Sequence, residues 1–219
     1  MQTPIGKAIP ETAWKRGVMA AAAMAIVALD LFLTWKGQYM TPYRLGLLMA
    51  ALALYGNFTQ WHSPSLGLVL RPAQGFRYWL LAALGIGVLM LAIIAVSLPI
   101  LAAFGKHISL GARSPSESLR WFYFTCINAP ILEEVVYRFI LCVPLVAILG
   151  GWPTIVLSTI AFASLHFVAG VASPDNVVAG LFLSWAFLKS GSLAVPITLH
   201  ALGNMSILVA SLAMWFWKG

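Results

Sequence analysis

Apolar residues in this chain gather in long runs that are separated by short polar connections. A helix needs about 20 apolar residues to cross the hydrocarbon core of a bilayer. The runs approach or exceed this length, and each predicts a helix: residues 17–35, 43–57, 78–104, 121–149, 154–170, 177–189 and 193–217. The pattern therefore predicts an all-α fold, a polytopic transmembrane helix bundle of about seven helices that forms one domain over residues 1–219.

The segments between the runs have the composition of loops and turns. Residues 58–77 hold two Pro and two Gly, and residues 150–153 predict a tight turn. Residues 105–120 form the densest polar cluster, which makes this connection a candidate surface for a substrate. Residues 1–16 are polar and are expected at the membrane surface. Because no small-residue cleavage site follows the first run, we expect a retained helix rather than a cleaved signal.

Composition supports an integral, multi-pass membrane protein. Hydrophobic residues make up 61% of the chain and charged residues 9%, whereas soluble domains carry roughly 25% charged residues. The net charge of +7 could suggest nucleic acid, but the cations lie at the ends of the runs or in connections, where headgroups and water solvate them. We therefore expect the lipid bilayer as a partner and no nucleic acid.

Charge gives no orientation in the membrane, and cysteine content gives only an indication of location. Twelve Lys and Arg lie at the ends of the runs or in connections. If the amino terminus lies inside and all seven helices cross, they divide six against six between the two sides, so the positive-inside rule assigns no orientation. The two cysteines form no disulfide framework or CxxC motif. Few cysteines and a compact chain favour the inner membrane of a prokaryotic cell.

A pair of acids interrupts the run at residues 121–149. Glu134 and Arg138 are four residues apart on a helix, in the order that favours an ion pair. Glu133 projects about 100° away from Glu134. A carboxylate in a low-dielectric, partly wetted cavity suits a general base or acid. The alternative is that both acids and Arg138 form one buried network that only fixes helix packing.

The next two runs each carry a histidine. His166 follows Phe162 by four residues, so Phe162 could form the wall of a pocket that His166 enters. His200 and Asn204 share another helix face, where they offer donors to an oxyanion or a partner to water. The alternatives are hydrogen-bonded packing for His166 and an interhelical hydrogen-bonding pair for His200 and Asn204.

Spacing suggests that these groups converge. Glu133, His166 and His200 follow one another at intervals of 33 and 34 residues, one in each of three candidate helices. Short connections can bring such helices together at similar depth, and with Asn204 the set makes a water-activating site on the last three or four helices. Asp30, near the end of the first run and close to Lys36, is interpreted as an interfacial residue.

The three motifs, in this order, resemble the CPBP family of intramembrane proteases. That family includes the prenyl-protein (CAAX) endopeptidase and Abi-type and bacteriocin-processing relatives, with the pattern EExxxR, FxxxH and HxxxN. Residues 129–132 also resemble its lead-in, whereas Phe139 stands where the family often has Gly. The resemblance covers residues 119–210, which would form the catalytic core, and implies hydrolysis of a peptide bond in a membrane-associated protein or peptide.

The resemblance also implies roles for individual residues. Glu133 and His166 would activate water, and His200 with Asn204 would stabilise the tetrahedral oxyanion. The supporting residues are Glu134 and Arg138, which would hold their helix in place, and Phe162.

A metal is not required by the sequence. Glu133, His166 and His200 could coordinate zinc in principle, but the chain lacks an HExxH motif. We therefore favour a metal-free glutamate mechanism and expect no cofactor.

Two other functions compete with a protease. Intramembrane acids and histidines also occur in proton-coupled transporters, but this chain shows no internal repeat and is short for a transporter built from two halves. A non-catalytic membrane scaffold would use the same polar groups for packing, and the intact set of Glu133, His166, His200 and Asn204 argues against it. Prenylated tails, bacteriocin leaders, signalling-peptide precursors and C-terminal sorting tails are all compatible substrates.

Overall fold

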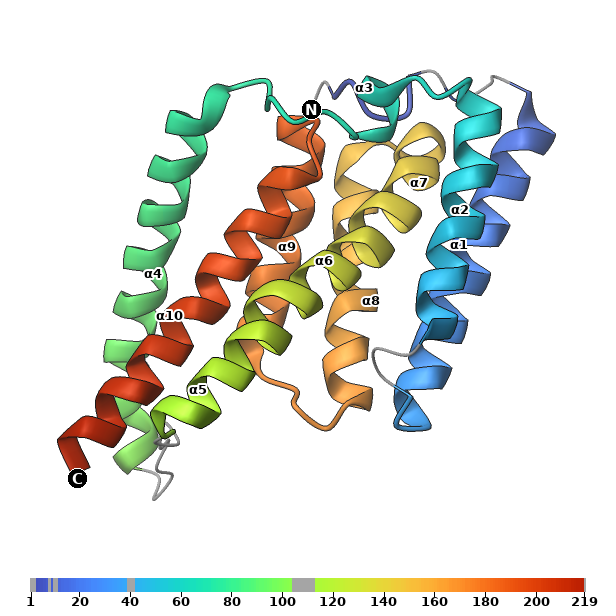
Figure 1. Ribbon diagram of the computed structural model, residues 1–219. Helices are drawn as coiled ribbons and strands as arrows, with labels where there is room; N and C mark the ends of the chain where they lie inside the picture. The colour runs from blue at the N-terminus through green and yellow to red at the C-terminus, as the bar shows by residue number, and fades with distance from the viewer. Residues whose placement is uncertain (1–2, 8, 10–11, 39–41, 104–112, 219) are drawn as a thin grey trace. The chain divides into compact units, whose positions relative to one another are not determined.

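The computed structural model describes residues 3–7, 9, 12–38, 42–103 and 113–218 (Figure 1). These residues are helical apart from turns, short connections and one isolated bridge between Leu68 and Ser192. The predicted all-α fold is confirmed. Much of the predicted polar connection at 105–120 falls in residues 104–112, which lie outside the described residues.

The helices follow the predicted apolar runs closely. Their bounds are α1 Ala13–Trp35, α2 Pro42–Thr59, α3 Ser63–Leu66, α4 Gly75–Ala103, α5 Pro115–Trp121, α6 Ala129–Glu134, α7 Leu141–Leu149, α8 Gly151–Val168, α9 Pro174–Ser190 and α10 Ala194–Lys218. Two π-helical turns, η1 Phe122–Asn128 and η2 Val135–Ile140, join α5, α6 and α7 into one continuous stretch. The short α3 lies inside the predicted loop 58–77. The predicted turn at 150–153 shortens to Gly150, because α8 begins at the next residue.

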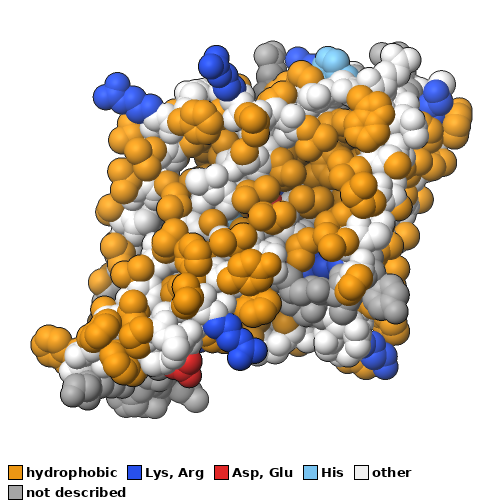
Figure 2. All heavy atoms as spheres, in the orientation of Figure 1, with side chains coloured by type: hydrophobic (Ala, Val, Ile, Leu, Met, Phe, Trp, Pro, Cys, Tyr) orange, Lys and Arg blue, Asp and Glu red, His pale blue; other side chains and the backbone are white. Residues whose placement is uncertain are grey.

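The chain is an integral membrane protein. Among the described residues, α1, α8 and α10 are long and apolar enough to cross a bilayer, and α4 contributes a shorter apolar helix over Gly75–Leu89. Large hydrophobic side chains are exposed along these helices, and they dominate the visible face in Figure 2. Exposed apolar side chains of this kind are solvated by lipid tails.

The chain divides into two compact units. The first unit comprises Met1–Ala73 and Ala129–Thr198, and the second comprises Gln74–Asn128 and Leu199–Gly219. The predicted catalytic core at 119–210 contributes residues to both. That residues 1–219 act as one domain stays a prediction.

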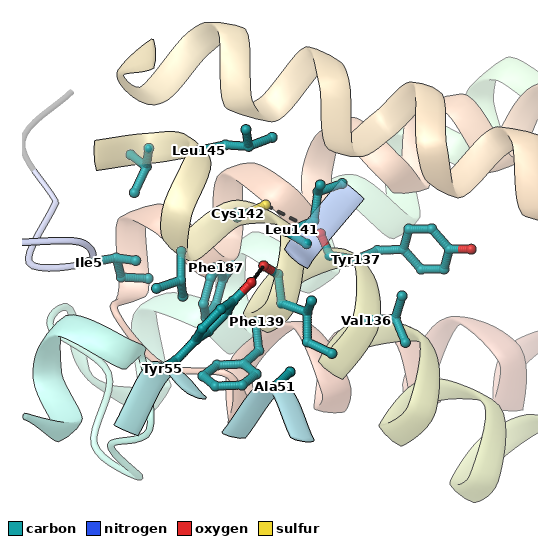
Figure 3. Close-up of a cluster of buried hydrophobic side chains, with 14 of the residues drawn as sticks. Ile5, Ala51, Tyr55, Val136, Tyr137, Phe139, Leu141, Cys142, Leu145 and Phe187 are labelled. Carbon is teal, nitrogen blue, oxygen red and sulfur yellow. Dashed lines mark hydrogen bonds between the residues drawn. The ribbon is translucent and has the colours of Figure 1, made fainter. Parts of the chain in front are cut away.

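A proline in α7 explains one buried contact at the centre of the first unit. Pro144 has no backbone N–H, so the carbonyl of Ile140, four residues earlier, loses its usual helical donor. The hydroxyl of Tyr55 donates to this carbonyl at 2.8 Å. Tyr55 is fully buried, and its ring packs against Phe139 (Figure 3). This contact joins α2 to η2.

The amino-terminal residues pack into the first unit. Ile5 and Ile9 are each only 3% exposed. Gly6 adopts a φ of 78° and donates its N–H to the carbonyl of Ser65 at 2.8 Å. The predicted polar surface segment thus includes two anchors in the apolar core.

The interpretation of Asp30 as an interfacial residue is wrong. Asp30 is 1% exposed, and its carboxylate pairs with Arg44 of α2, whose Nη2 donates to Oδ2 at 2.9 Å. The hydroxyl of Tyr137 donates to the same oxygen at 2.8 Å. The hairpin of α1 and α2 supplies a cation from the next helix, so Asp30 need not reach the headgroups.

Small side chains let α8 and α9 approach closely. The hydroxyl of Ser184 donates to the Gly180 carbonyl at 2.7 Å and lies 3.0 Å from the Ser158 oxygen. A Cβ at Gly180 would lie 3.0 Å from Cγ2 and 3.2 Å from Cα of Thr159. Close backbone approach at small residues is a usual way to pack helices in membranes.

Gly180→Ala should therefore destabilise the protein by about 1–3 kcal/mol, the usual cost of overpacking. The unfolding midpoint in detergent measures this change. Gly46→Ala in α2 is the matched control, because a Cβ there meets nothing within 4 Å and a helical Gly→Ala change adds helix propensity. Equal midpoints for the two variants would contradict the close contact.

A capping box begins α5 in the second unit. The Ser114 hydroxyl oxygen accepts from the N–H of Glu117, while the Glu117 carboxylate accepts from the N–H of Ser114 at 2.9 Å and from its hydroxyl at 2.8 Å. The hydrogen bond from the Ser114 side chain, followed by the one from its backbone, lowers the pKa of Glu117 below its ordinary value of 4.5.

Because this pKa is lowered in the folded state, the cap should stabilise α5 fully above about pH 4.5 and lose its effect as the pH falls through the lowered value. Hydrogen-exchange protection factors of α5 amides, compared between pH 6 and pH 3, measure the loss. Glu117→Gln keeps a capping side chain without the charge and should make the protection independent of pH. A wild-type protection factor that does not change with pH would refute the role of the charge.

Candidate active site

The first motif forms a fully buried ion pair in the first unit. Arg138 Nε lies 3.0 Å from Glu134 Oε2, and both side chains have no exposed surface. The prediction that these two residues pair is confirmed. Glu134 ends α6 and Arg138 lies in η2, so the pair spans the junction between the α-helix and the wider π turn.

The ring of Phe162 is the meeting point of the first two motifs. It is 1% exposed. The guanidinium carbon of Arg138 lies 4.6 Å from its centroid, in a cation–π arrangement. The ring of Tyr137 approaches it edge-on at 5.8 Å, and the ring of His166 lies 4.6 Å away. Phe162 therefore touches the imidazole and also covers the buried cation. That it forms the wall of a pocket stays a prediction.

The imidazole of His166 has a defined hydrogen bond. Its Nδ1 lies 3.0 Å from the carbonyl oxygen of Phe162. A carbonyl can only accept, so Nδ1 carries the proton in this bond and Nε2 of the neutral ring is the basic nitrogen. The side chain is half-buried in the last turn of α8. This arrangement suits a residue that accepts or relays a proton at Nε2.

Glu133 is buried in the same unit, at 3% exposure. It lies one residue before the Glu134–Arg138 pair, and its carboxylate is within electrostatic range of the Asp30 carboxylate and of the Tyr137 side chain. Its surroundings therefore include polar groups from α1 as well as from its own stretch.

The third motif lies on α10 in the second unit. His200 and Asn204 are both half-buried. The amide nitrogen of Asn204 donates to the carbonyl of Thr125, in the π turn η1, at 2.7 Å. An amide nitrogen carries two hydrogens, so this bond orients the group and uses one of its two donors. That His200 and Asn204 act together with Glu133 and His166 stays a prediction.

Two of the groups that shape the site were missed from the sequence, namely the Tyr137 hydroxyl and the Asp30–Arg44 pair. The sequence contained an indication in each case. Tyr137 places a hydroxyl beside Arg138, and Asp30 is an acid inside an apolar run, and a buried polar group of either kind needs a hydrogen-bonding partner. The Thr125 carbonyl carried no signal, because a backbone group bonds a distant side chain only once the π turn is formed.

An apolar groove of about 560 Å³ runs along α8 beside the second motif. Ala163, Ser164 and Phe167 form one side, and Pro174 and Val177 of α9 form part of the other. Glu133 and His166 do not line it. The groove offers apolar surface next to the helix segment that carries His166.

The described residues contain no group of three or more His, Cys, Asp or Glu side chains that could hold a metal ion. Glu133 and His166 lie in the first unit and His200 in the second, so the zinc site that they could form in principle is not tested. The metal-free mechanism stays a prediction.

Comparison with known proteins agrees with the motifs. Residues 115–206 match the family model Rce1-like, described as "Type II CAAX prenyl endopeptidase Rce1-like". The match contains all three motifs and confirms the resemblance to the CAAX-type intramembrane proteases. It covers less than half of the 219-residue chain, and it supports a protease. Comparison with curated proteins and with solved structures gives no match.

Removing one member of the buried ion pair should be costly. Glu134→Gln leaves the Arg138 charge in the apolar interior without its carboxylate, and the expected loss is about 3–5 kcal/mol in unfolding free energy. The double variant Glu134→Gln/Arg138→Met removes both charges and should be more stable than the single variant. Unfolding of purified protein in detergent measures both. A single variant as stable as wild type would show that the pair contributes nothing.

Proposed function

We propose that the protein is an intramembrane endopeptidase that hydrolyses a peptide bond of a membrane-associated protein or peptide through a glutamate-activated water. The observation that carries the proposal is the oriented His166, with Nδ1 engaged by the Phe162 carbonyl, in the unit that also buries Glu133. A fixed imidazole and a buried carboxylate are the groups that proton transfer to and from water requires.

In the proposed reaction, Glu133 accepts a proton from water while the water oxygen attacks the scissile carbonyl carbon. His166 takes part in activating the water through Nε2. His200 and the second N–H of Asn204 stabilise the negative charge that develops on the carbonyl oxygen. The C–N bond then breaks, the proton passes to the departing amine, and the water oxygen remains in the new carboxyl group.

The printed family name describes a prenyl endopeptidase, which makes a prenylated C-terminal peptide the first substrate to try. Leader peptides, signalling-peptide precursors and C-terminal sorting tails complete the test panel. The inner membrane of a prokaryotic cell is the proposed location.

Glu133→Gln should lower kcat for peptide cleavage by about 10²–10⁴, the usual contribution of a general base. Purified wild type and variant are compared in detergent on this panel, each with and without a strong zinc chelator. Glu117→Gln, an acid-to-amide change at the exposed capping box, is the matched control and should cleave normally.

Cleavage by Glu133→Gln at the wild-type rate would refute the glutamate mechanism. Loss of wild-type activity in chelator would show that a metal takes part. A wild-type protein that cleaves none of the panel would contradict the proposed activity on these substrates.

A further inference from the structure

A buried chain of contacts joins Asp30 of α1 to His166 of α8 within the first unit. The Tyr137 hydroxyl donates to Asp30 Oδ2 at 2.8 Å. The Tyr137 ring meets Phe162 edge-on at 5.8 Å with an interplanar angle of 85°, and Phe162 lies 4.6 Å from the His166 ring. Asp30, Tyr137 and Phe162 are each at most 1% exposed, so the chain runs entirely through the interior until it reaches the imidazole.

Tyr137 is held at both of its ends. Its backbone carbonyl accepts from the hydroxyl of Ser158 at 2.7 Å and from the thiol of Cys142 at 3.3 Å. Its ring extends away from Cys142 and from the cluster around Tyr55 (Figure 3), and the hydroxyl at the far end is bonded to Asp30. Hydrogen bonds in a low-dielectric interior are strong and costly to leave unmade. In this position of Tyr137, both its hydroxyl and its backbone carbonyl are hydrogen-bonded.

Arg44 makes this arrangement tenable in an apolar interior. It is 2% exposed and places its guanidinium against the Asp30 carboxylate, so the two charges neutralise each other. Tyr137 alone would not hold a buried carboxylate there. Both members of the pair come from the amino-terminal hairpin α1–α2, which carries none of the three motifs.

We propose that Asp30 and Tyr137 are positioning residues, which hold Phe162 and through it set the orientation of the His166 imidazole. The catalytic consequence rests on the proposed protease function. The positioning itself rests only on the contacts above, so the two can be tested separately.

Histidine resonances test the positioning without any substrate. The chain has four histidines, and in protein labelled with ¹³C-histidine the His166 signals are those that vanish in His166→Gln. Tyr137→Phe keeps the ring and removes one hydroxyl, and it should shift or broaden the His166 signals. Tyr55→Phe is the matched control: Tyr55 is also fully buried, but its hydroxyl donates to the Ile140 carbonyl, and the His166 signals should stay in place.

Steady-state cleavage tests the catalytic consequence. Tyr137→Phe and Asp30→Asn should each lower kcat per folded molecule about 10-fold to 100-fold, as expected when a reacting group is misplaced by a fraction of an ångström to 1 Å, with KM unchanged within about twofold. The double variant should lose no more than the worse single variant, because both changes break one chain. Tyr55→Phe should keep the wild-type kcat.

Each outcome decides a different point. His166 signals that do not move in Tyr137→Phe would overturn the positioning, even where Asp30→Asn fails to fold. Moved signals with an unchanged kcat would overturn its catalytic role. If the wild type cleaves nothing, the proposed function fails, and the histidine spectra alone decide whether the chain of contacts orients His166.

Discussion

The first unit depends on the complete burial of Arg138. An arginine in an apolar interior requires a counterion, and Glu134, one helical turn earlier, supplies it at 3.0 Å. Because Glu134 must face Arg138, the adjacent Glu133 projects in another direction. The ring of Phe162 covers the guanidinium. Because Phe162 and His166 both belong to α8, this contact helps to fix the position of α8 and therefore of His166.

The irregular helix around this pair creates a second requirement. Pro144 and the π turn η2 disturb the regular ladder of backbone hydrogen bonds, and membrane interiors hold no bulk water to replace it. Hydroxyl groups from two neighbouring helices fill the need, with Tyr55 donating to the Ile140 carbonyl and Ser158 to the Tyr137 carbonyl. The irregular backbone of η2 thus also provides the carbonyl groups through which α2 and α8 are hydrogen-bonded to it.

Contacts at helical spacing could be predicted from the sequence, whereas contacts between helices could not. The Glu134–Arg138 pair and the Phe162–His166 contact follow from residues four apart on one helix, and both are present. The same local reasoning places Asp30 at the membrane interface, close to Lys36. Its actual partner, Arg44, lies on the next helix, and nothing in the local spacing distinguishes a hairpin that brings the two together.

The family match begins at residue 115, yet the matched residues in the first unit rely on earlier residues for hydrogen-bonding partners. Two polar atoms of η2, the Tyr137 hydroxyl and the Ile140 carbonyl, have their partners on α1 and α2, at Asp30 and Tyr55. Without the amino-terminal hairpin, both atoms would be left in an apolar interior at the full cost of desolvation. The hairpin carries no motif, but it supplies partners for two buried polar atoms of the motif-bearing turn. The packed unit therefore extends beyond the residues that the family pattern can recognise.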